Sequence, residues 1–545
     1  MTLRILLADD HPVSLYLTGR SVTEIAATLC RSVKTIGRQK NCAMHKLGVS
    51  NDRELVHRAQ GHGPAPRRMT MDTARYNRPR CPALPNSLPR GGLPAAPSTL
   101  MLPPSSSPPP AVRPARAAPA LMIAAPASGQ GKTTVTAALA RLHARQGLHV
   151  RVFKTGPDFL DPTLLAAASG APVQSIDLWM TGEADARARL AEAAAEADLI
   201  LVEGVMGLHD GTPSSADVAR LFGLPVLAVI QAGAMAQTFG ALAYGLAHYG
   251  EPFRAMHVLA NGVGTARHAE MLRESVPPGI AWAGALARDA SASLPERHLG
   301  LFSADELPDL MTRLDTLADA LAALPLSHLP EPVTFAPVDT PAPPRLLAGK
   351  RVAIARDDAF RFVYPANLDT LIALGAHIAW FSPLRDHALP PCDAVWLPGG
   401  YPELHGAALA ANTSMHEALR DAHARRVPIL AECGGMMALF EHLVDREGVS
   451  HAMAGLLPGT ATMQRRLAAI GHQAVTLAES GAVLRGHTFH YSSAATPLKP
   501  VVRAVSPRDG STGEAVYQAG SLTASYVHFY FPSNPAAIAA VLGGG

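Results

Sequence analysis

Short apolar runs alternate with helix-like segments along two long stretches of the chain. In the first stretch, residues 120–328, apolar runs that we expect to be strands occupy 121–125, 149–153, 199–202, 226–230 and 257–260. The second stretch, residues 350–545, begins in the same way with apolar runs at 351–355, 394–397 and 428–431. Continuous apolar runs separated by helical patterns are typical of parallel sheets that helices cover on both faces. The pattern predicts two α/β domains in series.

Proline-rich segments flank these stretches. Residues 61–119 are crowded with Pro, Ser, Ala and Arg and include the run PPSSSPPP at 103–110, and a second Pro-rich segment follows residue 328. Such compositions bury too little apolar surface to build a core. We therefore predict a disordered linker at 61–119, a shorter linker at 329–349 and a separate N-terminal segment at 1–60.

The bulk composition narrows the class of protein. With 545 residues, of which 48% are hydrophobic and 17% charged, the chain exceeds one ordinary core and has a globular composition. A formal net charge of +3 is too small, at this length, to indicate binding to nucleic acid or to an anionic membrane. The most apolar stretch, 223–250, is interrupted by Gln231, Gln237 and His248, so we predict a buried strand followed by a helix.

The cysteines favour a reducing compartment. There are five, an odd number, and none of their spacings matches a CxxC or a Cys/His metal motif. The N-terminus also lacks the basic and then apolar pattern of a signal peptide. The sequence therefore predicts a cytoplasmic protein that does not associate with a membrane.

A glycine-rich segment between the first predicted strand and a helical pattern has the character of a phosphate-binding loop. Its ATP-binding candidates are Ser128, Gly129, Gln130, Gly131, Lys132, Thr133 and Thr134. Glycines let backbone amides converge on phosphate oxygens, a lysine adds a mobile cation, and a threonine hydroxyl can bind Mg²⁺ at the helix N-terminus. Pro126 stands where the GxxxxGK[ST] pattern has its first glycine, so the prediction depends on the strand–loop–helix context.

Acidic residues follow the next predicted strands. Asp158 comes after the second strand, and Glu203 and Asp210 come after the third. Because the carboxyl ends of parallel strands form the ligand crevice, we expect these side chains to converge on the nucleotide phosphates. The alternative role is to cap a helix or a turn, and it applies equally to Asp161 and Asp177. The predicted Mg²⁺ ligands are Thr133, Asp158 and Glu203.

Cys433 lies in a second strand-to-helix junction. The segment AECGG at 431–435 follows an apolar run and precedes the helix-like residues 436–440. Small residues permit the sharp turn of a nucleophile elbow, and a helix N-terminus lowers the pKa of a thiol toward the thiolate. A buried structural cysteine is the alternative, but the other four cysteines lack the Gly-Gly context. The pattern predicts Cys433 as a nucleophile.

A nucleophilic thiolate needs oxyanion donors and a base. The segment LPGGYPE at 397–403 offers the backbone amides of Gly399 and Gly400, which form the predicted oxyanion site together with the amide of Gly434. Two histidines are candidates for the base: His490, in GHTFHYS, and His528, in SYVHFY. A histidine at the end of an apolar run is often structural, so the residue patterns leave both candidates open.

Seven motifs occur in a fixed order: the phosphate loop, GPD at 156–158, EGVMG at 203–207, ERHLGL at 296–301, GGYPE at 399–403, ECGG at 432–435 and FHYS at 489–492. In this order they closely resemble the cobyrinic/hydrogenobyrinic acid a,c-diamide synthases, over about residues 120–545. The resemblance implies a P-loop domain like dethiobiotin synthetase, followed by a class I glutamine amidotransferase domain. The implied activity is ATP- and glutamine-dependent amidation of the a and c acetate carboxylates of cobyrinic or hydrogenobyrinic acid, a step of cobalamin biosynthesis.

The resemblance also assigns the glutamine site. It makes Cys433 the nucleophile that forms a thioester and His528, rather than His490, its base. The class I triad has a glutamate two residues after its histidine, but Tyr530 stands there, so a Cys–His pair is implied.

The synthetase half of the resemblance has both matches and departures. Asp158, Glu203 and Asp210 match acidic positions of the family's synthetase site. Gln231 stands where an Asp is expected after the fourth strand, and Gly262 interrupts the usual Asn-Arg-Val. ATP with Mg²⁺, glutamine and a corrin acid are implied, whereas the cobalt content of the corrin and the formation of a homodimer stay open.

Residues 1–60 resemble fragments of another class of protein. LRILLADDH at 3–11 looks like the first strand and acidic pair of a response-regulator receiver, and 21–50 is similar to a quorum-regulator helix-turn-helix. The rest of the receiver and much of the first DNA-binding helix are missing. We interpret the segment as a truncated remnant of a gene fusion or as the product of an early start codon, with Met101 or Met122 as later starts.

Three alternative functions explain parts of the pattern. An amidotransferase like cobyric acid synthase, acting on other corrin carboxylates, shares the architecture but is expected to lack the ERHLGL segment. A partitioning-type ATPase explains the phosphate loop but not Cys433. A DNA-binding regulator explains only the first sixty or so residues, where little basic surface remains, which argues against nucleic acid as a partner.

Overall fold

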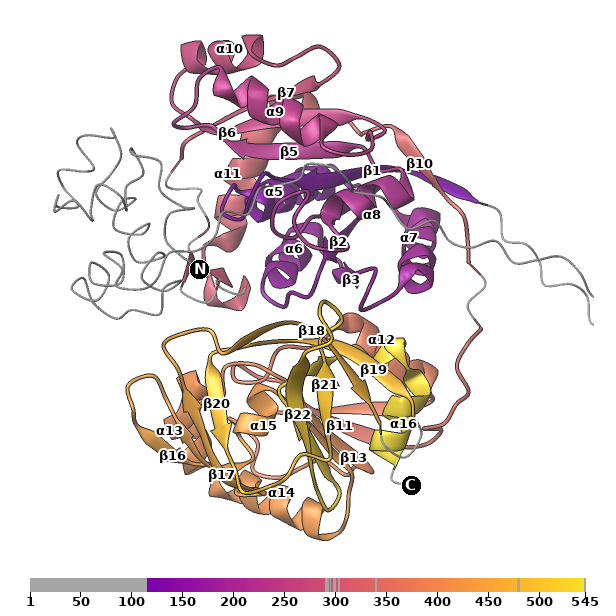
Figure 1. Cartoon of the computed structure of the whole chain (residues 1–545), viewed down its shortest axis with the longest axis vertical. Helices are drawn as coiled ribbons and strands as arrows, with labels where there is room; N and C mark the ends of the chain where they lie inside the picture. The colour runs from indigo at the N-terminus through magenta and orange to yellow at the C-terminus, as the bar shows by residue number, and fades with distance from the viewer. Residues whose placement is uncertain are drawn as a thin grey trace, which may run out of the picture. The chain divides into compact units, whose positions relative to one another are not determined.

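A computed structural model describes the chain over residues 115–289, 304–338, 341–477 and 481–543, and also at 294, 296–297 and 300–301. The predicted segment 1–60 and nearly all of the predicted linker 61–119 lie outside the described residues. The described residues, which all lie within 108–545, form one compact unit. Most of its strands belong to two large sheets, one before and one after residue 340 (Figure 1).

The first sheet contains the five predicted strands. Its strands follow the order β3-β2-β4-β1-β5-β6-β7, and each pair of adjacent strands in this order is parallel. The sheet also includes β3, which has only three residues, and β7, whose small and half-exposed residues give no continuous apolar run. The bounds are β1 (Arg116–Ala124), β2 (Val150–Thr155), β3 (Gln174–Ile176), β4 (Leu199–Glu203), β5 (Val226–Gln231), β6 (Met256–Val263) and β7 (Ala281–Ala287).

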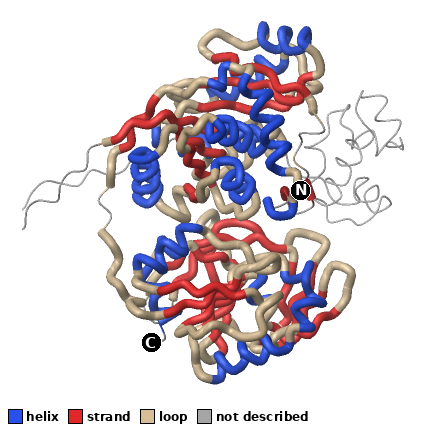
Figure 2. The backbone as a smooth tube through the Cα atoms, turned by 180° about the vertical axis from the view of Figure 1, so that it is seen from behind, coloured by secondary structure: helices blue, strands red, loops and turns tan. Residues whose placement is uncertain are grey.

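Helices cover both faces of this sheet, as Figures 1 and 2 show from opposite sides. Along β1, Met122 and Ala124 face one core while Leu121 and Ile123 face the other, because successive side chains of a strand point to opposite faces. The first core includes α7 (Glu183–Glu196), α8 (Ser215–Phe222), α9 (Thr238–His248) and α10 (Ala266–Glu274). The second includes α5 (Lys132–Arg145), α6 (Asp161–Ser169) and α11 (Leu310–Ala322).

The segment predicted to be the linker 329–349 contains a strand of the first sheet. This strand, β10 (Pro332–Phe335), pairs antiparallel with the start of β1, with Arg116 opposite Phe335. The parallel pairing of β1 with β4 begins only at Ala120, which leaves residues 116–119 available for β10. The sheet therefore extends into both predicted linkers. The remaining short elements here are β8 (Glu296–Arg297), β9 (Gly300–Leu301) and the 3₁₀ helices Ala304–Glu306 and Pro325–Ser327.

The second sheet is mixed, and the apolar runs predict only part of its parallel half. Strands β12-β11-β13-β14-β23 are parallel, and β22, β21, β18, β19 and β24 continue the sheet as antiparallel strands. The antiparallel strands alternate buried and exposed residues and therefore lack continuous apolar runs. The bounds are β11 (Arg351–Ala355), β12 (His377–Phe381), β13 (Ala394–Leu397), β14 (Ile429–Glu432), β18 (Ala469–Thr476), β19 (Val483–His490), β21 (Val502–Val505), β22 (Thr512–Ala519), β23 (Leu522–Ser525) and β24 (His528–Phe529).

Two layers cover the second sheet. On one face lie α12 (Pro365–Ala373) and α16 (Pro535–Gly543). On the other lie α14 (Thr413–Ala424) and a small sheet in the order β16-β15-β17-β20. The remaining bounds are α13 (Gly406–Ala411), α15 (Gly434–Met437), β15 (Phe440–Val444), β16 (Ser450–Ala452), β17 (Leu457–Met463), β20 (Ser492–Ala495) and the 3₁₀ helices Pro402–His405 and Phe531–Ser533.

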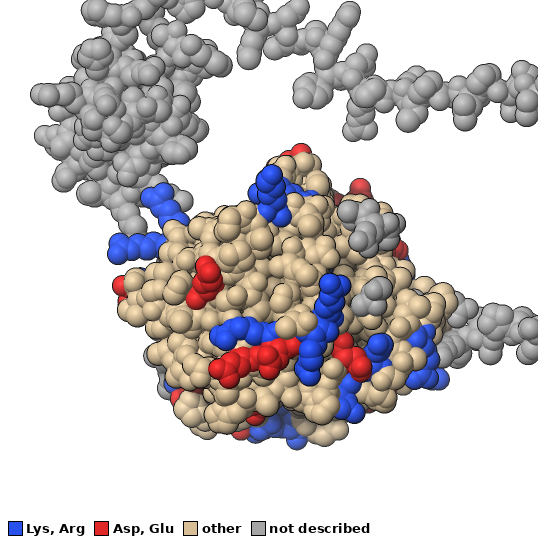
Figure 3. Space-filling model, turned by 90° about the horizontal axis from the view of Figure 1, so that it is seen from below, with Lys and Arg blue, Asp and Glu red and all other residues tan. Residues whose placement is uncertain are grey.

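Charges of both signs share the surface drawn in Figure 3, where acidic and basic side chains adjoin one another among uncharged residues. In the part of the chain that the structure describes, no helix combines the length and the apolar character that crossing a bilayer requires.

Candidate functional site

The phosphate loop lies between the end of β1 and the start of α5, where the sequence predicts it. Gly131 precedes the helix with a φ of 95° and has no room for a Cβ, which would collide with the side chain of Asn261. The Asn261 amide donates a 2.9 Å hydrogen bond to the Gln130 carbonyl, and the Gln130 side chain accepts a 2.8 Å bond from the amide of Gln231. These bonds fix the loop to the ends of β5 and β6.

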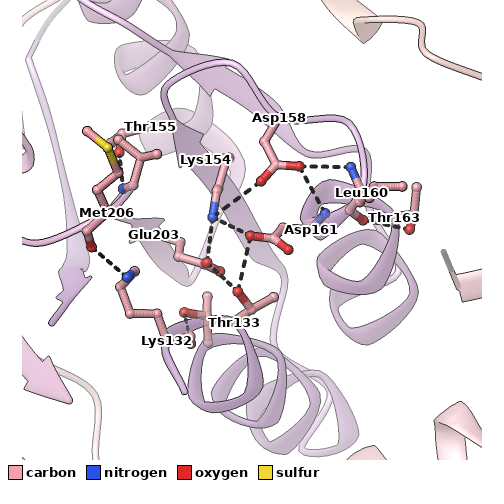
Figure 4. Close-up of polar contacts among 12 residues, drawn as sticks. Lys132, Thr133, Lys154, Thr155, Asp158, Leu160, Asp161, Thr163, Glu203 and Met206 are labelled. Atoms are coloured by element: carbon pink, nitrogen blue, oxygen red, sulfur yellow. Dashed lines mark hydrogen bonds and ion pairs between the residues drawn. The ribbon is translucent and has the colours of Figure 1, made fainter. Parts of the chain in front are cut away.

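Lys132 turns its ammonium group back onto backbone carbonyls. Its Nζ donates a 2.6 Å hydrogen bond to the Met206 carbonyl (Figure 4) and a 3.2 Å bond to the Ala127 carbonyl. Burial, together with the nearby charge of Lys154, lowers the pKa of Lys132. Phosphate oxygens are stronger acceptors for an ammonium group than carbonyls are, so a bound nucleotide can replace both contacts.

A cluster of polar side chains surrounds Lys154 beside this loop (Figure 4). Lys154 Nζ lies 2.6 Å from Asp161 Oδ2 and 2.6 Å from Glu203 Oε1. Thr133 Oγ1 donates to the same two oxygens, at 3.2 Å and 2.7 Å respectively. Lys154 and Glu203 meet because they stand opposite each other on the parallel strands β2 and β4.

Two members of this cluster were not assigned from the sequence. Lys154 is the next-to-last residue of β2, and a lysine near the carboxyl end of a largely buried strand is the signal that could have identified it. For Asp161 the sequence left capping and a site role open, and the structure puts its carboxylate against Lys154 and Thr133. The cluster thus has a buried cation at its centre.

Asp158 and Asp210, predicted for the same site, lie at its edge. Asp158 Oδ2 is 3.8 Å from Lys154 Nζ, while Oδ1 accepts hydrogen bonds from the amides of Leu160 and Asp161 and caps the start of α6. Asp210 Oδ2 accepts a 2.9 Å bond from the amide of Gly207 and so closes the turn after β4. Both carboxylates therefore also serve the alternative role of shaping a turn.

The protonation of the cluster follows from burial and from the mutual attraction of its charges. Burial alone would lower the pKa of Lys154, but the charges of Asp161 and Glu203 outweigh it and raise that pKa. Against the opposing effect of burial, Lys154 lowers the pKa of Asp161. Burial raises the pKa of Glu203, and Lys154 offsets this only in part. Lys154 is therefore charged at neutral pH and holds Asp161 ionised.

The oxygen atoms of this cluster suit Mg²⁺. Hydroxyl and carboxylate oxygens are the ligands that this ion prefers, and Thr133, Glu203 and Asp161 present them within one hydrogen-bonded group. Glu203 Oε2 is buried and has no hydrogen-bond partner among the described residues, which leaves it available to a cation. Of the predicted ligands, Thr133 and Glu203 thus lie together, and Asp161 is closer to them than Asp158 is.

Gln231 and Gly262, the two residues that depart from the expected pattern, contact each other. The side-chain oxygen of Gln231 lies where a Cβ at position 262 would be, and Gly262 has a φ of 73°. Gln231 therefore fills space that a larger residue at 262 would require. The hydrogen bond from Asn261 to Gln130 is present beside this pair, so the loop keeps its attachment.

Cys433 is the single residue between β14 and α15. Its φ of 46° and ψ of −108° are rare for a residue with a side chain, as expected for a strained nucleophile elbow. The predicted helix at 436–440 is wrong, because α15 is one turn that ends at Met437 and Phe440 begins β15. The elbow is thus a strand–turn–strand connection with one helical turn inside it.

The three glycines of the predicted oxyanion site pack around this elbow. A Cβ on Gly434 would lie 2.9 Å from the amide nitrogen of Gly400 and 2.8 Å from Pro402 Cδ, so the two glycine backbones are in contact. A Cβ on Gly399 would collide with the ring of His528. The structure therefore brings Gly400 and Gly434 together, and it places Gly399 against the predicted base.

The predicted lowering of the thiol pKa is wrong. Burial, with the charge of Glu403 acting in the same direction, raises the pKa of Cys433, and the hydrogen bond from the Gly434 amide only partly opposes this. Burial, with the charge of His490, lowers the pKa of His528 to about 3. At neutral pH the pair is therefore a thiol and a neutral imidazole, and burial disfavours the charged form of each.

The two candidate bases differ in their partners. His490 donates from Nδ1 to the Ser492 carbonyl at 2.9 Å and has Nε2 3.0 Å from Glu514 Oε1, so both of its nitrogens are engaged. His528 has Nδ1 buried without a hydrogen-bond partner in the part of the structure that is described. This difference favours His528 as the base, because a nitrogen held by a carboxylate or a carbonyl does not accept a thiol proton.

One cavity of about 210 Å³ connects the two groups of residues. Cys433, His490 and His528 line it from the second sheet and its loops, and Asp158 and Asp161 line it from the start of α6. Phe159 lies between them, with its ring centroid 5.0 Å from that of His528. The thiol and the edge of the Lys154 cluster thus line one cavity.

Glu432 is a further residue that the sequence did not assign. Its carboxyl group is buried beside Cys433 and accepts a 3.0 Å bond from the amide of Phe529 and a 3.2 Å bond from the Trp396 indole. Burial raises the pKa of Glu432 to about 8, although both hydrogen bonds oppose this. Glu432 thereby ties the residue after His528 to the residue before Cys433.

This raised pKa predicts a pH-dependent stability. The stabilising effect of a protonated Glu432 is complete below its ordinary pKa of 4.5 and is lost as the pH rises through about 8. Glu432→Gln is expected to be less stable than the wild type at about pH 5, since the Trp396 indole loses its acceptor, and the difference should shrink toward about pH 8. Melting temperatures across this range would measure it, with the exposed Glu417→Gln as control. A difference that stays constant with pH would contradict the raised pKa.

Comparisons with known proteins match both halves of the chain. Residues 121–301 match the CobQ/CobB/MinD/ParA nucleotide binding domain, and residues 351–536 match the CobB/CobQ-like glutamine amidotransferase domain. A hydrogenobyrinate a,c-diamide synthase of Pseudomonas aeruginosa is 60% identical over 425 residues, which are 78% of this chain and 97% of the relative. One of Stutzerimonas stutzeri is 59% identical, covering 78% and 99%. A cobyrinate a,c-diamide synthase of Herminiimonas arsenicoxydans is 49% identical, covering 78% and 97%.

Proposed function

The chain belongs to the family of hydrogenobyrinate and cobyrinate a,c-diamide synthases, and we propose that it amidates the a and c carboxylates of such a corrin acid with ATP and glutamine. The family relationship supports an α/β nucleotide-binding domain followed by a glutamine amidotransferase domain. In this proposal, residues 120–328 carry the ATP reaction and 350–545 carry glutamine hydrolysis.

The synthetase reaction activates a carboxylate. ATP binds with its phosphates on residues 128–134, where loop amides and Lys132 contact the phosphate oxygens. Thr133, Glu203 and Asp161 would hold Mg²⁺, which when bound neutralises charge on the phosphates. The corrin carboxylate attacks the γ-phosphorus, ADP leaves, and an acyl phosphate forms. Ammonia then attacks the acyl carbon, phosphate leaves, and an amide remains.

The glutaminase reaction supplies the ammonia. His528 takes the proton of the Cys433 thiol as sulfur attacks the side-chain amide of glutamine. The amides of Gly400 and Gly434 stabilise the oxyanion, and the departing ammonia takes the proton from His528. Water then hydrolyses the thioester to glutamate and frees the thiol.

The observation that carries this function is the shared cavity. It is lined both by Cys433 and by Asp161 of the Lys154 cluster, so in this proposal ammonia released at the thiol moves along the cavity toward the acyl phosphate. In bulk water at neutral pH ammonia is protonated and no longer nucleophilic, because the charge occupies its lone pair. A short path along the protein therefore limits the loss of the nucleophile by protonation.

The decisive experiment counts amides. The purified protein is incubated with Mg–ATP, glutamine and either hydrogenobyrinic or cobyrinic acid, and mass spectrometry counts the amide groups gained. We expect two amides on the preferred substrate, and amide formation should also proceed with ammonium chloride in place of glutamine. The absence of any amide on both acids, with either nitrogen source, would overturn the proposal.

A further inference from the structure

Tyr530 occupies the position where the class I triad has its glutamate, but its side chain contacts Asp185. Its ring is fully buried, and its hydroxyl donates a 3.0 Å hydrogen bond to Asp185 Oδ2. Asp185 belongs to the first turn of α7, in the nucleotide-binding half of the chain. Burial and the charge of Asp185 raise the pKa of Tyr530, so its hydroxyl stays protonated and acts as the donor.

Asp185 is a fixed acceptor. Arg189, one turn later on α7, donates from Nε to Asp185 Oδ2 at 2.9 Å, and its Nη1 lies 3.8 Å from Asp369 Oδ2 on α12. Gln174 of β3 donates to the same Asp369 oxygen at 3.2 Å. Side chains from α7 and β3 thus form one polar network with side chains from the amidotransferase half. A network of this kind orients its members more firmly than a single exposed pair does.

The ring of His528 depends on packing for its orientation. A hydrogen bond from Nδ1 to a carboxylate is the usual device that orients a catalytic imidazole, but here Nδ1 has no partner among the described residues. Instead, the ring stacks on His487 with centroids 5.0 Å apart, and Phe159 of the β2–α6 loop packs at 5.0 Å. Next to it, Glu432 holds the backbone amide of Phe529, and Asp185 holds the side-chain hydroxyl of Tyr530.

We infer that Tyr530 is a positioning residue for glutamine hydrolysis, which holds His528 in place through its hydrogen bond to Asp185 of the nucleotide-binding half. This inference rests on the proposed function, in which His528 is the base for Cys433. It makes glutamine hydrolysis dependent on the contact between the two halves, since one of the two anchors next to His528, Asp185, belongs to the nucleotide-binding half.

Two conservative variants of the full chain test the inference, one at the donor and one at the acceptor of the Tyr530–Asp185 hydrogen bond. Tyr530→Phe removes only the hydroxyl, and Asp185→Asn keeps the shape of the acceptor but removes its charge. Tyr517→Phe, a half-buried tyrosine of β22, is the matched control for the first. Glu183→Gln, in the same first turn of α7 and paired with Arg187, is the control for the second. Glutamine hydrolysis and ammonia-dependent corrin amidation are measured separately for each.

We expect both test variants to lower the kcat of glutamine hydrolysis about tenfold, with the KM for glutamine unchanged because neither residue contacts it. The double variant should be no slower than the single ones, and ammonia-dependent amidation should stay within about twofold of the wild type. Asp185→Asn is the sharper test, because a merely structural fault in α7 would impair the ATP reaction of its own half first. Hydrolysis within twofold of the wild type in either variant, or an equal loss of both reactions, would overturn the inference. A failure of the proposed function itself would show differently, as a wild type that makes no amide from ammonia.

Discussion

Cys433→Ala is expected to abolish glutamine-dependent amidation while ammonia-dependent amidation continues. Removing the nucleophile of a covalent mechanism costs at least about 10³-fold in kcat, because no neighbouring group can form the thioester. The ATP reaction does not use the thiol, so amide formation from ammonium chloride should remain within about twofold of the wild type. Counting amides by mass spectrometry with each nitrogen source measures both effects.

The matched control is Cys392→Ala, since Cys392 is the other free cysteine in the described part of the chain and does not line the cavity. It should retain both reactions. Full glutamine-dependent activity in Cys433→Ala would remove Cys433 from the mechanism, and loss of the ammonia reaction would mean that the substitution damages the fold.

Lys154→Met should have the opposite pattern, with loss of amidation from both nitrogen sources and survival of glutamine hydrolysis. It leaves Asp161 and the fully buried Glu203 without their shared cation, and breaking a buried ion pair from one side costs about 3–5 kcal/mol of folding stability. Amidation with ammonia, glutamine hydrolysis and denaturant unfolding would separate the chemical effect from the stability effect.

Two further variants sharpen this test. Lys350→Met changes an exposed lysine and should alter neither activity nor stability. The double variant Lys154→Met/Glu203→Gln should regain part of the lost stability, because it removes a buried charge, but no amidation. Wild-type amidation in Lys154→Met, or a double variant less stable than the single one, would contradict the assigned roles.

The parts of the site that depend on short contiguous segments were predictable from the sequence. The phosphate loop, the Cys433 elbow and the acidic strand ends are each contained in a few residues, and their strand–turn context shows in the apolar pattern. Five of the seven parallel strands of the first sheet were predictable for the same reason, since burial on both faces produces continuous apolar runs.

The parts that depend on strand order were not predictable. Lys154 reaches Glu203 only because β2 lies next to β4, and His490 reaches Glu514 only through the antiparallel half of the second sheet. The prediction of a lowered thiol pKa was wrong for a similar reason, because the burial that raises the pKa of Cys433 comes from residues distant in sequence. The domain limits and the roles of the site residues remain predictions.

The volume of the shared cavity sets the local concentration of the ammonia released into it. One ammonia molecule within a cavity of about 210 Å³ corresponds to a local concentration of about 8 M. At neutral pH most dissolved ammonia is protonated, so in the proposed mechanism the acyl phosphate reacts first with the ammonia released at the thiol. The preference for glutamine over free ammonia therefore depends on the cavity volume. A substitution that enlarges the cavity is expected to lower the local ammonia concentration.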